Sequence, residues 1–245
     1  MNPTPSIPKQ TPKSRHIDAS RAGAATPKPK RRPTDGSRNE RKDKQGSNPG
    51  DDRPHQLLRH SVALQFRIAI HEAGHAVTRL YLGLGVLEKI TIDAPEGGGV
   101  TWRMDALDDQ TEELLTAAIV IALAGRATEE EILASTAGHS GGPVFSDLAY
   151  ATDIAFEMEA TLGLGQKWPL LYRPTTDRAI LFALDHDLAT RVNARLETAY
   201  GAARRIVARQ RDAIEHLAAL LLKDRTLEGD ALDRILAEIA ERIGE

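Results

Sequence analysis

The chain has 245 residues, a formal net charge of -3 at neutral pH and no cysteine. The lack of cysteine excludes disulfides and thiolate metal sites, so any metal would need histidine and carboxylate ligands. No run of about 18 apolar residues exists, and the N-terminus lacks the apolar stretch of a signal peptide. We therefore expect a cytoplasmic protein with no membrane span.

The first part of the chain differs in composition from the rest. Residues 1–60 hold 14 basic and 6 acidic side chains, and nine of the 13 prolines lie before residue 55. A segment with so few large apolar residues cannot bury enough surface to offset the entropy of ordering it. We predict that residues 1–56 form a disordered basic tail and that residues 57–245 form the folded domain.

The basic tail raises the question of a nucleic-acid or anionic-membrane partner, because residues 28–32 contain four basic side chains. Acidic residues interrupt the tail, however, and it has no Phe, Tyr or Trp to stack on bases. This composition favours a solubilising extension over a nucleic-acid binding segment.

From residue 57 onward the pattern predicts a mainly α-helical fold with one small β-hairpin. Apolar residues spaced three or four apart predict a first helix from Leu57 to about Gly83–Gly85. The alternating, β-branched segment 87–93 predicts a strand, and segment 100–104 predicts the returning strand after a Pro- and Gly-containing turn.

Helices are expected through the remainder of the chain. We predict helices at 111–127 and 144–162, separated by a flexible glycine-rich loop at 137–143. Residues 183–223 are rich in Ala, Arg and Leu and predict one long helix or two, after a connector that contains Pro169 and Pro174. A last helix is expected at 229–243.

The segment His71-Glu72-Ala73-Gly74-His75 falls inside the first predicted helix. Residues four apart in a helix lie nearly one above the other, about 6 Å along the axis, so both imidazoles can face one ion. Zinc lowers the pKa of a bound water towards about 7, and a glutamate beside the first ligand can take its proton. The pattern predicts His71 and His75 as zinc ligands and Glu72 as the general base of a peptidase.

The alternative is a helix that carries two histidines without binding metal. Gly74 argues against it, because glycine inside a helix costs about 1 kcal/mol relative to alanine unless another part of the chain approaches closely. A third ligand is required, and the metzincin class is excluded because Thr78 and Tyr81 replace its glycine and histidine. Spacing alone leaves six candidates for that ligand: Glu129, Glu130, Glu131, His139, Asp147 and Asp153.

Several segments occur in an order that is found in one known family. They are the HEAGHA motif at 71–76, the hairpin at 89–101, Ala-Gly-Arg-Ala-Thr-Glu-Glu at 124–130, Ser-Asp-Leu-Ala-Tyr-Ala-Thr at 146–152, and helical segments at 199–202 and 220–227. Together they resemble the peptidase domain of the FtsH family of membrane-bound, ATP-dependent zinc proteases. The resemblance covers about residues 60–240.

The resemblance implies that His71, His75 and Asp147 bind Zn²⁺ and that Glu72 is the catalytic base. From the residues alone, Asp147 serves equally well as a helix cap. In the family the second strand of the hairpin borders the active site, so we expect residues 97–102 to pair with an extended polypeptide substrate by strand addition. Trp102 itself is interpreted as a packing residue.

The sequence also departs from the family. It contains no Gly-x-x-x-x-Gly-Lys-Ser/Thr phosphate loop and no membrane helices. We therefore expect an ATP-independent zinc endopeptidase that cleaves unfolded or flexible polypeptides, or one that depends on a partner ATPase or adaptor for delivery. The alternatives are a catalytically weak, zinc-bound binding or regulatory module and a zinc-stabilised scaffold. The sequence does not decide between a monomer and a homo-oligomer.

Overall fold

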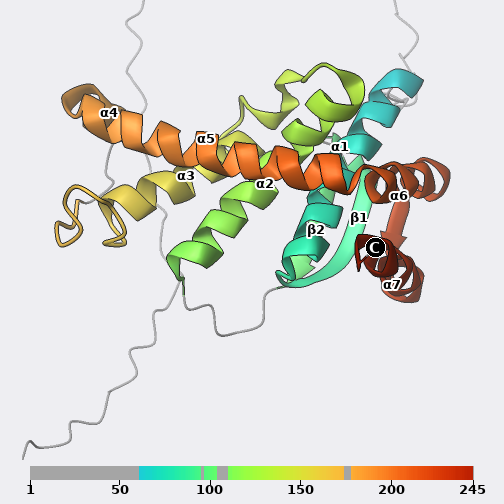
Figure 1. Cartoon of the computed structure of the whole chain (residues 1–245). Coiled ribbons are helices and arrows are strands. Elements are labelled where there is room, and N and C mark those ends of the chain that lie inside the picture. The colour runs from blue at the N-terminus through green and yellow to red at the C-terminus, as the bar shows by residue number, and fades with distance from the viewer. Residues whose placement is uncertain (1–60, 95–96, 104–109, 174–177, 245) are drawn as a thin grey trace, which may run out of the picture. The chain divides into compact units, whose positions relative to one another are not determined.

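A computed structural model describes residues 61–94, 97–103, 110–173 and 178–244. The described residues are mainly helical, with one small antiparallel sheet (Figure 1). The helices are α1 Val62–Leu82, α2 Glu112–Leu133, α3 Asp147–Ala160, α4 Arg178–Leu184, α5 His186–Arg209, α6 Arg211–Asp224 and α7 Gly229–Gly244, with a 3-10 turn, η1, at Gly138–Ser140. The strands are β1 Val86–Ala94, β2 Gly97–Arg103 and β3 Thr226–Glu228.

Helix α1 is defined by a cap at each end. The Ser61 hydroxyl accepts a hydrogen bond from the Leu64 N–H at 3.2 Å, which satisfies one of the free donors of the first turn. Gly83 ends the helix with φ 65°, a left-handed conformation that glycine adopts without strain. Leu57 and Leu58, where we predicted the helix to start, lie outside the described residues.

The middle of α1 is surrounded by the rest of the domain. Every residue from Ala69 to Arg79 is buried except His71, which is only slightly exposed. Helices α2, α5, α6 and α7 and the strands β1 and β2 all contact α1. His71 and His75 therefore lie on a helix that is enclosed by most of the other elements, and α5 crosses α2 beside it (Figure 1).

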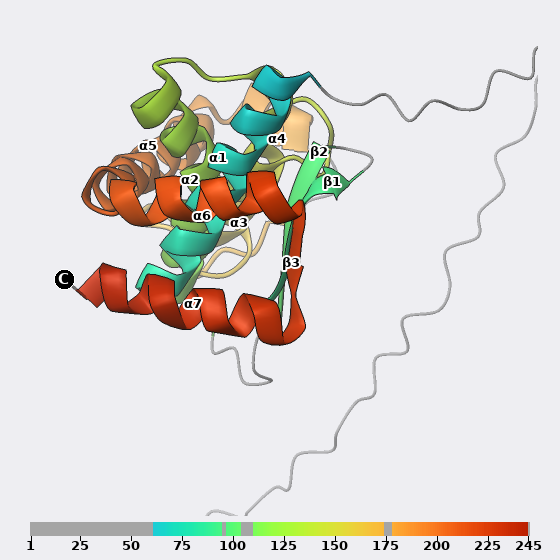
Figure 2. The ribbon, with the colours of Figure 1, turned by 90° about the vertical axis from the view of Figure 1, so that its right-hand side faces the viewer.

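The predicted hairpin is confirmed, and a third strand that we did not predict extends it. The strand order is β2-β1-β3, with both pairs antiparallel. Ile90 lies opposite Val100 on β2 and opposite Leu227 on β3, and it is fully buried. β3 leads from the end of α6 to the start of α7 (Figure 2). β2 thus occupies one edge of the sheet, and its outer side has no strand partner among the described residues.

Several predicted boundaries were wrong. α2 continues to Leu133 beyond the expected end at residue 127, and α3 is shorter than the predicted 144–162. The segment predicted as one long helix or two, 183–223, contains two, α5 and α6, which divide at Gln210. The boundary errors lie at element ends, where local sequence signals are weakest. Helix α4, which lies at the end of the preceding connector, was not predicted.

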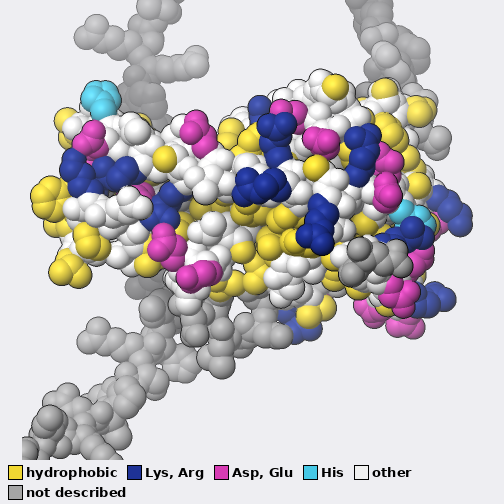
Figure 3. All heavy atoms as spheres, viewed as in Figure 1, with side chains coloured by type: hydrophobic (Ala, Val, Ile, Leu, Met, Phe, Trp, Pro, Cys, Tyr) yellow, Lys and Arg dark blue, Asp and Glu magenta, His cyan; other side chains and the backbone are white. Residues whose placement is uncertain are grey.

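Two surface properties follow from the structure. No helix among the described residues is long and apolar enough to cross a membrane. On the face that α5 crosses, basic and acidic side chains are interspersed (Figure 3). Neither sign of charge dominates that face, so it offers no extended basic surface to a nucleic acid.

Candidate metal centre

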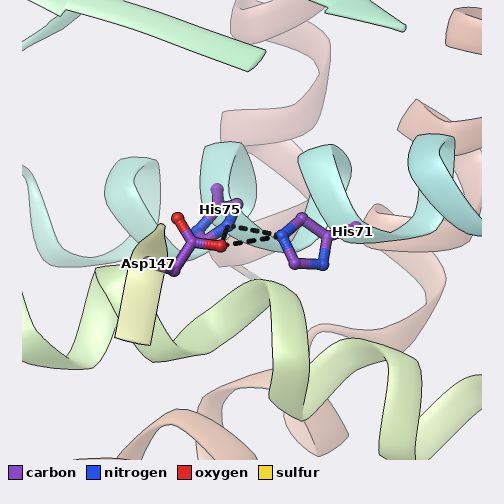
Figure 4. Close-up of side chains that lie close together, drawn as sticks. All are labelled: His71, His75 and Asp147. Carbon is purple, nitrogen blue, oxygen red and sulfur yellow. Dashed lines mark hydrogen bonds and ion pairs between the residues drawn. The ribbon is translucent and has the colours of Figure 1, made fainter. Parts of the chain in front are cut away.

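Three side chains with metal-binding atoms converge between α1 and α3. The Nε2 atoms of His71 and His75 lie 3.0 Å apart, as expected for residues one helical turn apart. Asp147 Oδ2 lies 3.0 Å from His71 Nε2 and 3.3 Å from His75 Nε2. The three groups point toward one another (Figure 4). Among the described residues they form the one cluster of three ligand atoms within 4.8 Å of one another.

Asp147 reaches this position because it is the first residue of α3. The helix is capped by its neighbour, since the Ser146 hydroxyl accepts a hydrogen bond from the Ala149 N–H at 3.3 Å. The alternative that Asp147 acts as the cap is therefore wrong. Its carboxylate remains free to face the two histidines, with the side chain about one third exposed.

The remaining ring nitrogen of each histidine has its own partner. His71 Nδ1 lies 2.8 Å from Glu129 Oε1, and His75 Nδ1 lies 2.8 Å from the carbonyl oxygen of Ile121. Both partners accept a hydrogen bond, so each Nδ1 carries a proton, and each Nε2 is the nitrogen that would present a lone pair to a bound metal. A hydrogen bond from the second nitrogen to a carboxylate or carbonyl is the usual arrangement of a metal-binding histidine.

Glu129 connects this site to a second segment of the chain. Its Oε2 accepts hydrogen bonds from Arg67 Nη1 at 2.6 Å and from the backbone N–H of Ala137 at 2.8 Å. Glu129 is 2% exposed. Burial raises the pKa of the Glu129 carboxyl, but the hydrogen bonds from His71, Arg67 and Ala137 lower it further than burial raises it. The net pKa is therefore below the ordinary value, and the carboxylate stays charged.

The pKa values of the groups in and beside the metal-free cluster are shifted by burial and by their mutual contacts. Burial lowers the pKa of His71, but hydrogen bonds to Asp147 and Glu129 outweigh it and raise that pKa to about 10. Burial also raises the pKa of Asp147, and the two histidines reverse this and hold it well below its usual range. Burial raises the pKa of Glu72, although the histidines oppose the shift. A cation that displaces the His71 proton would take over the stabilisation of these carboxylates.

Two glycines allow the helices to approach the site closely. A Cβ on Gly125 of α2 would lie 2.5 Å from the Nε2 atoms of both His71 and His75. A Cβ on Gly74 of α1 would overlap the Thr128 side chain and lie 3.2 Å from the Ala124 carbonyl oxygen. The expected close approach at Gly74 is thereby confirmed, and Gly125 leaves the space in which the ligand atoms meet.

The cluster opens into a cavity of about 1150 Å³. Glu72 lines this cavity together with the histidines, and so do residues 97–99 of β2. A Cβ on Gly98 would lie 2.5 Å from Glu72 Oε1, so β2 runs directly against the carboxylate. The arrangement places a buried carboxylate and a candidate metal group on one cavity that is large enough for a peptide segment.

The donor set fits zinc. Two imidazole nitrogens and one carboxylate oxygen are its usual ligands, and three protein ligands leave a fourth position for water or substrate. Ligands at about 2.0–2.1 Å from a tetrahedral ion lie roughly 3.3–3.4 Å apart. The separations of 3.0–3.3 Å between Asp147 and the histidines are close to this spacing, so a small adjustment of the side chains would accommodate the ion.

A model of peptidase family M41 matches residues 61–235. This range includes α1, the hairpin, α2, α3 and the C-terminal helices up to the first part of α7. The chain belongs to peptidase family M41.

The relatives of this M41 chain are considerably longer than the chain itself. It is 34% identical over 180 residues to the ATP-dependent zinc metalloprotease FtsH 2 of Symbiobacterium thermophilum, and the alignment covers 70% of this chain and 30% of the relative. It is 30% identical over 190 residues to the chloroplastic ATP-dependent zinc metalloprotease FTSH 8 of Arabidopsis thaliana, covering 71% of this chain and 27% of the relative. The chain thus spans about 30% of the length of the relatives it matches.

In this M41 chain, three of the other candidates for the third ligand make contacts away from the point where His71, His75 and Asp147 meet. Asp147 joins the two histidines, whereas Glu129 binds the far side of the His71 ring. Glu130 accepts a hydrogen bond from Tyr200, and Asp153 pairs with Arg178. The His139 side chain lies outside the described residues. Sequence reasoning did not predict that Glu129 binds the His71 ring. The signal for it in the sequence was its position near the end of the segment 124–130, which resembles a motif of the family.

Proposed function

We propose that this chain is a zinc-dependent endopeptidase with His71, His75 and Asp147 as ligands and Glu72 as the general base. The observation that supports it most directly is the convergence of the three ligand atoms within 4.8 Å beside Glu72. Membership of peptidase family M41 supports the same reaction. A cytoplasmic location and a disordered tail at residues 1–56 stay predictions.

Each residue has a distinct task in this proposal. When bound, zinc supplies the positive charge that activates water and polarises a peptide carbonyl. Glu72 accepts the proton of the attacking water and can pass it to the departing amine. Burial raises the pKa of Glu72, which makes the carboxylate a stronger base than an exposed glutamate. Glu129 and the Ile121 carbonyl hold the two imidazoles in the orientation that presents Nε2.

The substrate is proposed to be an extended polypeptide. β2 is an edge strand of the sheet, and its residues 97–99 line the cavity next to Glu72. An extended backbone can pair with such an edge, which brings a peptide bond to the base without recognition of particular side chains. Folded proteins offer few such segments, so unfolded or flexible polypeptides are the expected substrates.

Zinc content and casein cleavage of three proteins test the proposal. Glu72→Gln should keep zinc and lose roughly 10²- to 10⁴-fold in turnover, since only the base is removed. Asp147→Ala should lose both zinc and turnover. Glu157→Gln is the matched control, because Glu157 is an exposed acid that lines the same cavity. Equal activity in the wild type and Glu72→Gln would refute the proposed mechanism.

The same assay addresses the energy source and the alternative functions. The chain contains no phosphate-loop motif, and we propose that it cleaves flexible substrates without ATP, or receives stable ones from a partner ATPase or adaptor. Addition of ATP should leave casein cleavage unchanged. A zinc-bound protein that binds casein but does not cleave it, with or without ATP, would instead indicate a binding or regulatory module.

A further inference from the structure

A buried arginine shares the cavity with the candidate metal group. Arg79 follows His75 by four residues on α1, so it lies on the same face of the helix, about 6 Å farther along the axis. Arg79 is 7% exposed, and it lines the cavity together with Trp102 of β2 and Tyr150 of α3. Its guanidinium therefore contributes to the wall of the space in which the peptide bond would be cleaved.

The surroundings of Arg79 hold the guanidinium in place. The Cζ atom of Arg79 lies 4.0 Å from the centre of the Trp102 ring, a favourable cation–π arrangement. Nη1 donates a hydrogen bond to the carbonyl oxygen of Leu84 at 3.1 Å, just after the end of α1. The negative end of the helix dipole adds a small stabilisation. These contacts fix the plane of the group and use one of its five N–H donors.

Within the part of the chain that the structure describes, no carboxylate pairs with Arg79. Other partly buried arginines differ: Arg67 pairs with Glu129, and Arg191 and Arg195 both pair with Glu159. Charged groups are seldom buried without a partner, because removing them from water is costly. Burial lowers the pKa of Arg79 to about 10, so the group stays charged at neutral pH, and none of the described carboxylates compensates this charge.

We propose that Arg79, stacked on Trp102, forms a subsite that binds a carboxylate of the polypeptide substrate. The inference rests on the proposed peptidase function. A guanidinium binds a carboxylate through two parallel hydrogen bonds. Stacking on Trp102 orients the N–H donors before the carboxylate binds. This carboxylate is either an aspartate or glutamate side chain or the free C-terminus of the substrate.

The position of Arg79 sets which substrate residue is recognised. An extended chain advances about 3.3 Å per residue, and the backbone of Arg79 lies about 6 Å beyond that of His75 along the helix axis. The carboxylate therefore belongs to a residue within about two positions of the cleaved bond. A glutamate there should be preferred over glutamine, and lysine should be rejected because its charge would meet the buried guanidinium.

Matched fluorogenic peptides test the proposal. For each position within two residues of the cleaved bond, one set of four peptides is made. Three are amidated and carry Glu, Gln or Lys at that position, and the fourth carries Gln there and has a free C-terminus. Wild type should cleave the best Glu peptide roughly 10- to 100-fold more efficiently than its Gln counterpart, the range expected for a charged hydrogen bond. If only the free C-terminus gives this gain, the terminal carboxylate is the one recognised. Equal cleavage of all four would overturn the proposal.

Two variants assign the preference to Arg79. Arg79→Met should cleave the Glu and Gln peptides with equal efficiency, whatever its overall rate, and Arg79→Glu should favour the Lys peptide. Arg204→Met is the control, because Arg204 is an exposed arginine on α5. Binding of the labelled Glu peptide to zinc-loaded Glu72→Gln, followed by fluorescence anisotropy, should weaken by the same factor when Arg79→Met is added.

The outcomes separate this inference from the proposed function. If no peptide is cleaved by the zinc-loaded wild type, the peptidase proposal fails. If peptides are cleaved but charge has no effect, or if the preference persists in Arg79→Met, only the carboxylate subsite fails. A lack of charge preference in the wild type overturns the subsite even if an Arg79 variant does not fold, and if one of the two variants does not fold, the other still assigns the preference.

Discussion

The two sides of the candidate metal group are built differently. His71 and His75 stand on α1 where it packs against α2, and we refer to this as the helix-pair side. Asp147 follows the connection at 134–146, which is mostly exposed apart from Ser140 and Ser146, and we refer to this as the loop side. Two candidate ligands are thus positioned by close helix packing, and the third is positioned by the path of a loop and the cap of α3.

Glu129 joins the two sides. One of its oxygens binds His71 on the helix-pair side, and the other accepts the Ala137 N–H on the loop side. The difference between the two sides shows that the candidate ligands are positioned in two ways. Close helix packing positions His71 and His75, and hydrogen bonds through Glu129 connect them to the loop that leads to Asp147. Substitutions on each side should therefore affect folding and metal binding in different proportions.

The largest effect is expected from Gly125→Ala on the helix-pair side. The added methyl group would lie 2.5 Å from both Nε2 atoms, so α2 must move away or the histidines must turn. Zinc binding should be lost, and the free energy of unfolding should fall by about 1–3 kcal/mol, as for other overpacked sites. Zinc titration and chemical denaturation measure the two effects, and Gly138→Ala, where a Cβ would meet open space, is the control.

Asp147→Ala should separate metal binding from folding. The loop-side carboxylate is about one third exposed and does not cap α3, so the metal-free protein should stay folded and lose only the charged hydrogen bond to His71, about 1–3 kcal/mol. Zinc affinity should fall by more than the 10- to 100-fold typical of an outer hydrogen-bond partner. Competition with a chromogenic chelator measures it, and unchanged affinity would remove Asp147 from the ligand set.

Glu129→Gln should weaken zinc binding by roughly 10- to 100-fold, because the amide accepts a weaker hydrogen bond from His71. The loss should be smaller than for Asp147→Ala. Glu131→Gln, two residues farther along α2, is the matched control. If Glu129→Gln and Asp147→Ala had the same effect, the link between the two sides would matter as much as the ligand itself.

Zinc binding should release about one proton near pH 7.5. The pKa of His71 in the metal-free protein is raised to about 10, so the ring is protonated there and must lose its proton to bind metal. Calorimetry in buffers of different ionisation enthalpy measures this release. The folded pKa also exceeds the ordinary 6.5, so the metal-free protein should lose stability as the pH rises from about 6.5 to about 10. Zinc binding without proton release would contradict the assignment.

The smallest effect is expected from Ser146→Ala, which removes the cap of α3. Loss of such a cap costs about 1 kcal/mol of stability. Because the cap also fixes the start of the helix that carries Asp147, zinc affinity should fall slightly. Ser146→Asp, which retains a side-chain acceptor, should restore stability. A fall in stability with unchanged zinc affinity would show that the cap does not position the ligand.

How much of this could be predicted from the sequence depends on the range of the interactions. The paired histidines and Glu72 are local, since spacing within one helix brings them together. The hairpin is also local. Asp147 needed a family resemblance, because its approach to His71 crosses 76 positions of the chain, and spacing left five other candidates open.

The missed features have physical reasons. β3 has only three residues and exists through its pairing with β1, after Arg225 leaves α6 with φ 67°. Its sequence carries no strand pattern of its own. Glu129 was a candidate ligand by type and spacing, but whether a carboxylate binds the metal or the ring behind it depends on the helix crossing that Gly74 and Gly125 permit.

The β3 pairing has a consequence for how the protein is made. Thr91 and Thr226 hydrogen-bond across 135 positions, and α1 is covered by α6 and α7 on either side of β3. During synthesis at roughly 5–20 residues per second, the histidine helix emerges long before the segments that enclose it. A nascent chain therefore has the motif but lacks its enclosing helices, so the candidate metal group should form only after most of the domain has left the ribosome.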